Sequence, residues 1–312
     1  MSNRQVPELS LLSYVNGSPE VRNQFVTDLF EGLKEYGFII LVDHTVDALK
    51  VSKAYDLVHQ FFQLPSDTKN LYGGVPGGQR GYTPFKKEHA KDSTHPDLKE
   101  FWHVGRELIN DSPYKGRYPE NLWPKEVLNF KEVFLELYDS MDQTAVLLLE
   151  AIGAGLGAKE NFFKEMIHDG NTVLRTIHYP PTKGEDTENS VRAGAHEDIN
   201  LITLLVGATD GGLELLDRDG KWLSVKTEPG QIVVDTGDMM SRLTNDILPS
   251  TTHRVVNPSE SNSTRYSMPF FVHPHDDAMI SCLDSCIGEG AKYEDITASK
   301  FLIQRLEEIG LY

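Results

Sequence analysis

Three residues in the second half of the chain have the types and spacing of a metal site. His196 and Asp198 are separated by one residue, and His253 comes directly before a short strand-like run, 254–256. The residues after Asp198, 199–206, are β-branched and leucine-rich, which predicts a buried strand. Alternate side chains of an extended chain share a face, so His196 and Asp198 should lie together. Two histidines and one carboxylate on one face can hold a divalent metal and leave the opposite coordination positions open, as at non-haem Fe(II) sites.

Each of these signals also has an ordinary structural interpretation. A His-x-Asp triplet is frequently a solvated strand end whose side chains hydrogen-bond to neighbours, and short motifs often match by chance. A single histidine such as His253 is more often an ordinary residue than a ligand. The order of the signals favours the metal site: a His-x-Asp triplet, a long gap, a histidine before a strand, and then Arg-x-Ser in the next strand.

Arg265 and Ser267 have the types and spacing of an anion site. Only Tyr266 separates them in an extended segment, so their side chains share a face. A guanidinium presents a planar fork of donors that matches a carboxylate, and a hydroxyl two residues along can donate to the same anion. A lone arginine more commonly makes a structural salt bridge, but the segment 268–272 predicts a core strand. An arginine that enters a core needs an anionic partner, and a bound organic acid would provide one.

Six segments around these residues resemble the iron(II)/2-oxoglutarate-dependent oxygenase superfamily, in its isopenicillin N synthase-like branch. They follow the family's order over roughly a hundred residues, which makes chance a poor explanation. The matching segments are L-R-T-I-H-Y-P-P (174–181), G-A-H-E-D-I-N-L-I-T-L-L, G-G-L-E-L-L-D-R-D-G-K-W, P-G-Q-I-V-V-D-T-G-D-M-M-S-R-L-T-N-D, T-H-R-V-V-N-P and R-Y-S-M-P-F-F-V.

The resemblance implies a role for each candidate residue. The metal ligands for Fe(II) would be His196, Asp198 and His253. The far carboxylate of the cosubstrate 2-oxoglutarate would be bound by Arg265 and Ser267, and Tyr179 would hydrogen-bond the same acid. The implied reaction uses O₂ and couples the oxidative decarboxylation of 2-oxoglutarate to hydroxylation, desaturation or cyclisation of a small organic substrate. Plant members often carry N-Y-Y-P-P where this chain has I-H-Y-P-P, so the asparagine contact to the cosubstrate is missing.

The residues alone leave other functions open. Isopenicillin N synthase shares these motifs, uses no 2-oxoglutarate, and holds the carboxylate of its substrate with the arginine and serine. A metal- and acid-binding jelly roll without catalytic turnover would carry the same side chains. A zinc hydrolase would fit the three metal ligands, but it gives no reason for the Arg-x-Ser pair.

The sequence does not identify the substrate. In folds of this kind the residues that contact a substrate lie on variable loops. We expect Tyr82 and Phe85, in the segment 82–87, and Phe271, beside the Arg-x-Ser pair, to contact it.

The rest of the chain predicts the elements that position these side chains. Apolar residues at helical spacing predict helices over 21–33, 49–62, 130–152 and 296–309, and the run 38–42 predicts a strand. The polar stretch 86–96 has no period and predicts a mobile surface loop. After residue 171 short strands alternate with turns, and Asp219-Gly220 predicts a hairpin.

We therefore expect a mixed α/β fold: an all-β core with helices, built as a distorted double-stranded β-helix, or jelly roll, with a helical N-terminal region packed on it. The expected organisation is a single compact domain over 1–312. Within it, 1–168 forms the mainly helical N-terminal region, 169–280 the oxygenase core, and 281–312 a C-terminal loop and helix.

Composition restricts the partners. The chain has 312 residues and a net charge of −17, which disfavours binding to nucleic acid or to anionic membranes. The two cysteines do not have the spacing of a zinc site, so we expect reduced thiols. The start of the chain has no apolar signal core and no apolar run is long enough for a membrane helix, which predicts a cytoplasmic protein. The oligomeric state is not predicted.

Overall fold

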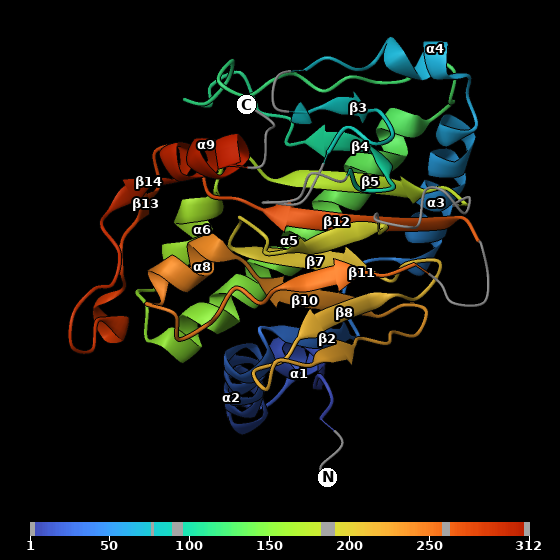
Figure 1. Cartoon of the computed structure of the whole chain (residues 1–312). Coiled ribbons are helices and arrows are strands. Elements are labelled where there is room, and N and C mark those ends of the chain that lie inside the picture. The colour runs from blue at the N-terminus through green and yellow to red at the C-terminus, as the bar shows by residue number, and fades with distance from the viewer. Residues whose placement is uncertain (1–3, 76–77, 89–95, 182–190, 258–262, 309–312) are drawn as a thin grey trace.

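Two β-sheets form the core of the computed structural model, which describes residues 4–75, 78–88, 96–181, 191–257 and 263–308. The larger sheet has the strand order β1-β2-β10-β7-β12-β5-β4-β3, and the smaller has β6-β11-β8-β9. Figure 1 shows the strands of both sheets running across the molecule in stacked rows. The strands are β1 (Glu8–Ser10), β2 (Phe38–Val42), β3 (Gly81–Thr83), β4 (Glu100–Gly105), β5 (Val173–Tyr179), β6 (Ala193–His196), β7 (Ile202–Val206), β8 (Leu213–Leu216), β9 (Trp222–Ser224), β10 (Ile232–Thr236), β11 (His253–Val255) and β12 (Arg265–Val272), with a separate pair, β13 (Met279–Ile280) and β14 (Ile296–Thr297).

The helices begin and end at residues suited to those positions. The hydroxyl of Ser18 accepts a hydrogen bond from the Val21 N–H at the start of α2, and Gly37, with φ of 67°, ends that helix in a left-handed conformation. The long helix α5 likewise ends at Gly157, with φ of 66°. The helices are α1 (Leu11–Asn16), α2 (Pro19–Tyr36), α3 (Ala48–Phe62), α4 (Ser66–Asn70), α5 (Phe130–Leu156), α6 (Phe162–Ile167), α8 (Asp238–Leu243) and α9 (Ala298–Glu308).

The larger sheet has an apolar cluster on each face. One cluster lies between the sheet and the helices and includes Trp102 of β4 and Phe134 of α5. The other fills the space between the two sheets and includes Phe101 of β4, Tyr179 of β5 and Leu215 of β8. Adjacent residues such as Phe101 and Trp102 therefore point to opposite faces, as strand geometry requires. Figure 1 shows α5 passing behind β7 and β12, so the helices leave the inside of the roll to the functional side chains.

The structure confirms the predicted jelly roll and its main elements. The hairpin at Asp219-Gly220 joins β8 to β9 as expected. The predicted C-terminal helix is shorter at its start, because residues 296–297 pair as β14, and the end predicted at 309 lies outside the described residues. None of the helices in the described ranges is long and apolar enough to cross a membrane.

Two expectations differ from the structure. The strand predicted to begin at Ile199 begins at Ile202, because the carbonyls of Asp198 and Ile199 accept the N–H groups of Asp238 and Met239 at the start of α8. The N-terminal region does not merely pack on the roll: β1, β2, β3 and β4 are strands of the larger sheet itself.

Candidate active site

The three predicted metal ligands converge at one end of the smaller sheet. His196 of β6 and His253 of β11 are direct antiparallel partners, and Asp198 follows two residues after His196. The Nε2 atoms of both histidines lie 3.8 Å from Oδ1 of Asp198. One ligand atom from each residue lies within 4.8 Å of the other two. His196 and Asp198 therefore do share a face, although the chain between them is no longer part of the strand.

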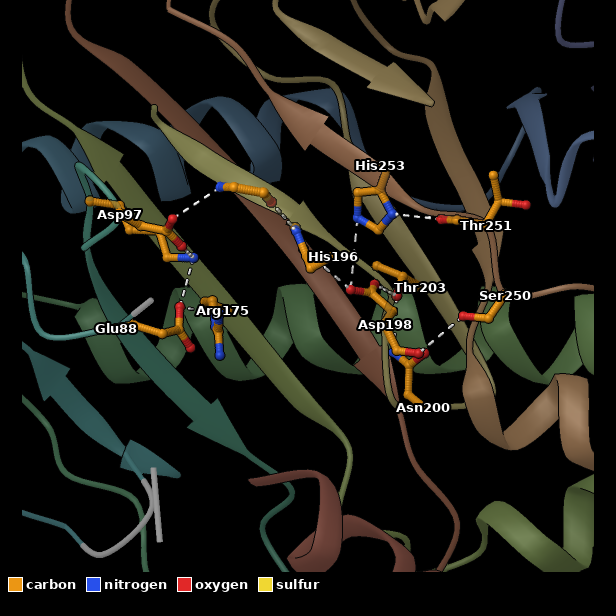
Figure 2. A network of polar contacts seen from close by, with 12 residues as sticks. Glu88, Asp97, Arg175, His196, Asp198, Asn200, Thr203, Ser250, Thr251 and His253 are labelled. Atoms are coloured by element: carbon orange, nitrogen blue, oxygen red, sulfur yellow. Dashed lines mark hydrogen bonds and ion pairs between the residues drawn. The ribbon is translucent and has the colours of Figure 1, made fainter. Parts of the chain in front are cut away.

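Backbone carbonyls fix the orientation of both imidazoles (Figure 2). The Nδ1 atom of His196 lies 2.7 Å from the carbonyl oxygen of Gly194, and Nδ1 of His253 lies 3.1 Å from that of Thr251. A carbonyl can only accept, so each Nδ1 carries a proton, and Nε2 is the ring nitrogen that each histidine turns toward Asp198. Burial, followed by the neighbouring His253, lowers the pKa of His196 to about 4. Both rings are thus oriented with Nε2 toward the place where a metal would bind.

Asp198 is held by a second layer of polar groups. Its Oδ2 accepts a hydrogen bond from the hydroxyl of Thr203, and that hydroxyl accepts one from Nδ2 of Asn200 at 2.9 Å. Asp235, on β10, lies nearby. Burial, and then the charge of Asp198, raise the pKa of Asp235 well above its ordinary value. Two buried acidic side chains beside two imidazoles are the environment that a divalent cation stabilises.

Arg265 and Ser267 face the inside of the roll together. Arg265 pairs with Tyr179 and Ser267 with Ile177 across β12 and β5. The guanidinium lies over the Tyr179 ring at 4.8 Å, and its Nε donates to the carbonyl of Asp210 at 3.1 Å. Arg265 is 1% exposed, and its buried Nη1 has no hydrogen-bond partner in the described ranges. A buried, unpaired cationic donor is costly, and a bound carboxylate would satisfy it.

The surroundings of Arg265 leave room for a small acid. Arg265 lines a pocket of about 1080 Å³, together with Tyr55 of α3 and the apolar side chains Leu205, Leu213 and Val233. Ile177 provides an apolar side chain beside Ser267, at the position where many plant members have asparagine, so the polar contacts to an acid must come from Arg265 and its neighbours.

The three residues predicted to contact the substrate lie in three different environments. Phe271 follows Ser267 on the inner face of β12 and pairs with Thr203, the residue that hydrogen-bonds Asp198. Tyr82 lies on the opposite face of the sheet: its ring contacts Phe61 of α3, and its hydroxyl donates to Glu100. That part of the prediction is corrected, because a strand side chain on the helical face cannot reach the inside of the roll.

Phe85 lies in the turn after β3, partly exposed, with the ammonium of Lys86 at 5.6 Å from its ring. Its contact with a substrate stays a prediction.

A group of charged side chains lies close to the predicted metal ligands and is not predicted from the sequence. Glu88 lies in the stretch predicted to be a surface loop, 86–96, yet it is 8% exposed and is paired with Lys99 and Arg175. The residues 89–95 of that stretch lie outside the described residues. The signal that could have pointed to the group is Arg175 itself, a charged residue in phase with the inward-facing Ile177 and Tyr179.

Comparison with known proteins gives a consistent result. A profile of the 2OG-Fe(II) oxygenase superfamily matches residues 170–274, and a profile described as the non-haem dioxygenase in morphine synthesis N-terminal matches residues 6–126. A 2-oxoglutarate-Fe(II) type oxidoreductase from Aspergillus fumigatus is 32% identical over 293 residues, which cover 91% of this chain and 86% of the relative. The chain belongs to the 2-oxoglutarate/Fe(II) oxygenase superfamily.

Solved structures of superfamily members superpose over nearly the whole chain. A putative 2OG-Fe(II) oxygenase family protein from Caulobacter crescentus has 45% identity and a TM-score of 0.87, and the match covers 97% of this chain and 98% of the other. A full-length protein from Neurospora crassa, in complex with α-ketoglutarate, has 28% identity and a TM-score of 0.88, and the match covers 98% of this chain and 97% of the other.

The family and the site together define the activity. The protein is a mononuclear non-haem Fe(II) dioxygenase that couples oxidative decarboxylation of 2-oxoglutarate to oxidation of a small organic substrate, with O₂ as the oxidant. The alternatives of an oxidase without 2-oxoglutarate, a jelly roll without turnover and a zinc hydrolase are set aside.

Proposed function

We propose that His196, Asp198 and His253 hold the Fe(II) of this oxygenase, and that Arg265, Ser267 and Tyr179 hold 2-oxoglutarate. The observation that carries the proposal is that a possible metal site and a buried arginine lie inside the same roll. The Nε2 and Oδ1 atoms of the three ligands converge, and Nη1 of Arg265, which has no partner among the described residues, is buried on the facing sheet.

Each group has a distinct task. The two imidazoles and the carboxylate would hold the metal through one ligand atom each, and a site with three protein ligands can also accept a cosubstrate and O₂. The bound iron supplies redox chemistry with O₂ that no protein side chain provides. Arg265 neutralises the distal carboxylate of 2-oxoglutarate, and Ser267 lies on the same face of β12, in reach of the same group. Tyr179 lies against the guanidinium and limits its movement.

The overall reaction consumes one 2-oxoglutarate, one O₂ and one substrate C–H bond. It releases succinate and CO₂, with one oxygen atom in succinate and the other in a hydroxylated product. We propose hydroxylation as the outcome, because it breaks only one substrate C–H bond, whereas desaturation or cyclisation breaks a second substrate bond and releases the second oxygen atom as water. Crystals of the Neurospora crassa protein contain thymine or 5-formyluracil, so a substrate the size of a single ring is the starting expectation here.

We also propose that residues 1–312 form one domain of the isopenicillin N synthase-like branch, located in the cytoplasm. The pairing of β2 with β10 and of β4 with β5 supports a single domain, because it joins the N-terminal region to the core. Both cysteines, Cys282 and Cys286, are free, which supports a reducing compartment.

The test is anaerobic addition of Fe(II) and then 2-oxoglutarate to the apoprotein, followed by the visible charge-transfer band of a metal-chelated keto acid. His253→Ala should abolish the band, since the metal loses a ligand. Arg265→Gln should still bind iron but require at least about tenfold more 2-oxoglutarate, because a charge-assisted, bidentate contact is lost.

The outcome that contradicts the assignment is a normal band in either variant. If iron binds tightly to the natural protein and no band forms, 2-oxoglutarate does not chelate the metal at these residues.

A further inference from the structure

Four charged side chains form a buried network beside the metal ligands (Figure 2). The ammonium of Lys99 lies 2.6 Å from Oε2 of Glu88 and 2.8 Å from Oδ2 of Asp97, and Nη1 of Arg175 lies 3.4 Å from Oε2 of Glu88. Glu88, Asp97 and Lys99 are each less than 9% exposed. The two positive and two negative charges balance.

The network faces the inside of the roll. Arg175 lies two residues before Ile177 and four before Tyr179 on β5, so its side chain points to the same face as theirs. Its partner on β4 is His103, which shares that face with Phe101. The inner face of the larger sheet is therefore apolar around Tyr179 and charged around Arg175.

Two hydrogen bonds connect the network to a metal ligand. Oδ1 of Asp97 accepts the N–H of Gly194 at 2.9 Å, and the carbonyl of the same residue accepts from Nδ1 of His196 at 2.7 Å. Figure 2 shows this chain running from Asp97 to His196, with Glu88 and Arg175 below it. The network is thus a wall next to the proposed metal ligand His196, and not a distant structural ion pair.

The guanidinium of Arg175 is held in a fixed orientation. Its Nε donates to Nε2 of His103 at 2.5 Å, and its plane lies near two phenyl rings, 4.3 Å from the centroid of Phe101 and 5.1 Å from that of Phe271. Its Nη2 makes no hydrogen bond to the described residues, while the side chain keeps 16% exposure. A donor fixed on several sides loses little entropy when it binds a ligand.

The ionisation of the network is also fixed. Burial acts to raise the pKa of Glu88, but Arg175 and then Lys99 outweigh it and hold that pKa well below its ordinary value. Burial, and then the charge of Arg175, lower the pKa of His103 well below its ordinary value. At neutral pH the wall consequently presents an ionised acceptor, Glu88, next to the guanidinium of Arg175.

Stability alone does not explain such a wall, because buried ion pairs are rarely more stable than apolar packing of similar volume. We propose that Glu88 and Arg175 recognise the polar edge of an uncharged planar substrate in which an N–H donor adjoins a C=O acceptor, as in a lactam, imide or pyrimidine. The N–H donates to Glu88, the C=O accepts from Nη2 of Arg175, and Phe271 contacts the ring. The inference rests on the proposed function, since it places the substrate beside the proposed metal ligands.

Other substrate classes fit the wall less well. A carboxylate substrate would bring a net negative charge against Glu88 and break the charge balance. A hydrocarbon ring would leave Nη2 of Arg175 unpaired after displacing its water. Lys99 is positioned between Glu88 and Asp97 and acts as a positioning residue for Glu88.

The experiment measures binding to the holoprotein loaded anaerobically with Fe(II) and 2-oxoglutarate. The probes are thymine, 1,3-dimethylthymine, which lacks both N–H donors, and 4-methylbenzoate, which is an anion of similar size. Binding is followed by the shift of the charge-transfer band and, independently, by calorimetry. Thymine should bind at least about tenfold more tightly than either other probe, because each of them loses a hydrogen bond to a charged group.

Matched variants separate recognition from folding. Glu88→Gln should weaken thymine binding at least about tenfold and leave the 2-oxoglutarate band unchanged. Asp142→Asn is the control, since it removes a carboxylate from the pair of Arg106 and Asp142 on the helical face. Arg175→Lys keeps the charge but loses the planar fork, so it should also weaken thymine binding.

The inference is overturned if the three probes bind equally, if 4-methylbenzoate binds best, if thymine does not bind, or if Glu88→Gln lowers the melting temperature without lowering thymine affinity. Loss of the band in the natural protein would instead contradict the proposed function, and calorimetry with thymine would still decide the inference.

Discussion

Replacing Thr203 by valine should weaken iron binding without removing an iron ligand. Thr203 is 2% exposed on the inner face of β7. Its hydroxyl donates to Oδ2 of Asp198, while Oδ1 of the same carboxylate faces the Nε2 atoms of both histidines. Valine has nearly the same shape as threonine, so the substitution removes the hydrogen bond and leaves the packing in place.

The size of the effect follows from the charge of the acceptor. A hydrogen bond to a charged group contributes about 1.5–3 kcal/mol, and partners that orient metal ligands typically affect metal affinity about 10- to 100-fold. Because about 1.4 kcal/mol corresponds to a factor of ten, the two ranges agree. The apoprotein should lose about 1–3 kcal/mol as well, since Nδ2 of Asn200 loses the acceptor that lies at 2.9 Å and stays buried.

The assay is an anaerobic Fe(II) titration in competition with a chromogenic chelator, with urea unfolding of the apoprotein measured in parallel. Thr203→Ser keeps the hydroxyl and serves as the control. We expect serine to bind iron within about threefold of threonine and valine to bind at least about tenfold more weakly. The reasoning is refuted if valine stays within about twofold of the natural protein, or if serine and valine weaken iron binding equally, since packing would then be the cause.

Three further outcomes follow from the structure. Arg265→Lys keeps a positive charge but loses the planar fork, so the half-saturating 2-oxoglutarate concentration for the charge-transfer band should rise at least about tenfold, and an unchanged value would contradict this. Because the pKa of His103 is lowered by burial and by Arg175, the unfolded chain binds a proton that the folded chain does not as pH falls below the ordinary value of about 6.5. In thermal melts the natural apoprotein should therefore lose more stability between about pH 7.5 and pH 5 than the His103→Gln variant does. If the stability difference between the two proteins instead grows as the pH falls, the predicted direction of the effect is wrong. Gly37→Ala places a Cβ at a φ of 67° and directly against the hydroxyl of Thr251, so urea unfolding should show a loss of about 1–2 kcal/mol or more, and no loss would mean that the loop relaxes freely.

Local alternation predicted the parts of the site that lie on single strands. Arg265 and Ser267 were assigned to one face from their spacing alone, and the register with Tyr179 and Ile177 confirms that face. The convergence of His196 with His253 needed more than alternation, because 57 positions separate them in the sequence. There the order of motifs that the family shares carried the prediction.

The charged wall could not be predicted in the same way. Glu88 lies in a polar stretch without a period, and its partner Arg175 is 87 positions away, so no local pattern shows that the carboxylate is buried. The predicted substrate contact of Tyr82 is wrong for a different reason. Its neighbour Gly81 pairs with His103 on the inner face, and one position along the strand reverses the side chain.

The two family segments, 6–126 and 170–274, meet at two places in the larger sheet, β2 beside β10 and β4 beside β5, and the second of these is the seam next to the charged wall. The strand β4 lies on one side of it and β5 on the other, and Glu88 and Arg175 meet across it. A chimera that takes its first half from one oxygenase and its second half from another would keep all three residues proposed to bind iron, because they lie in the second half. It would nevertheless combine half of one parent's charged wall with half of the other's. Both halves must therefore come from the same parent if the chimera is to keep that parent's substrate specificity, even though one half alone supplies the residues proposed to bind iron.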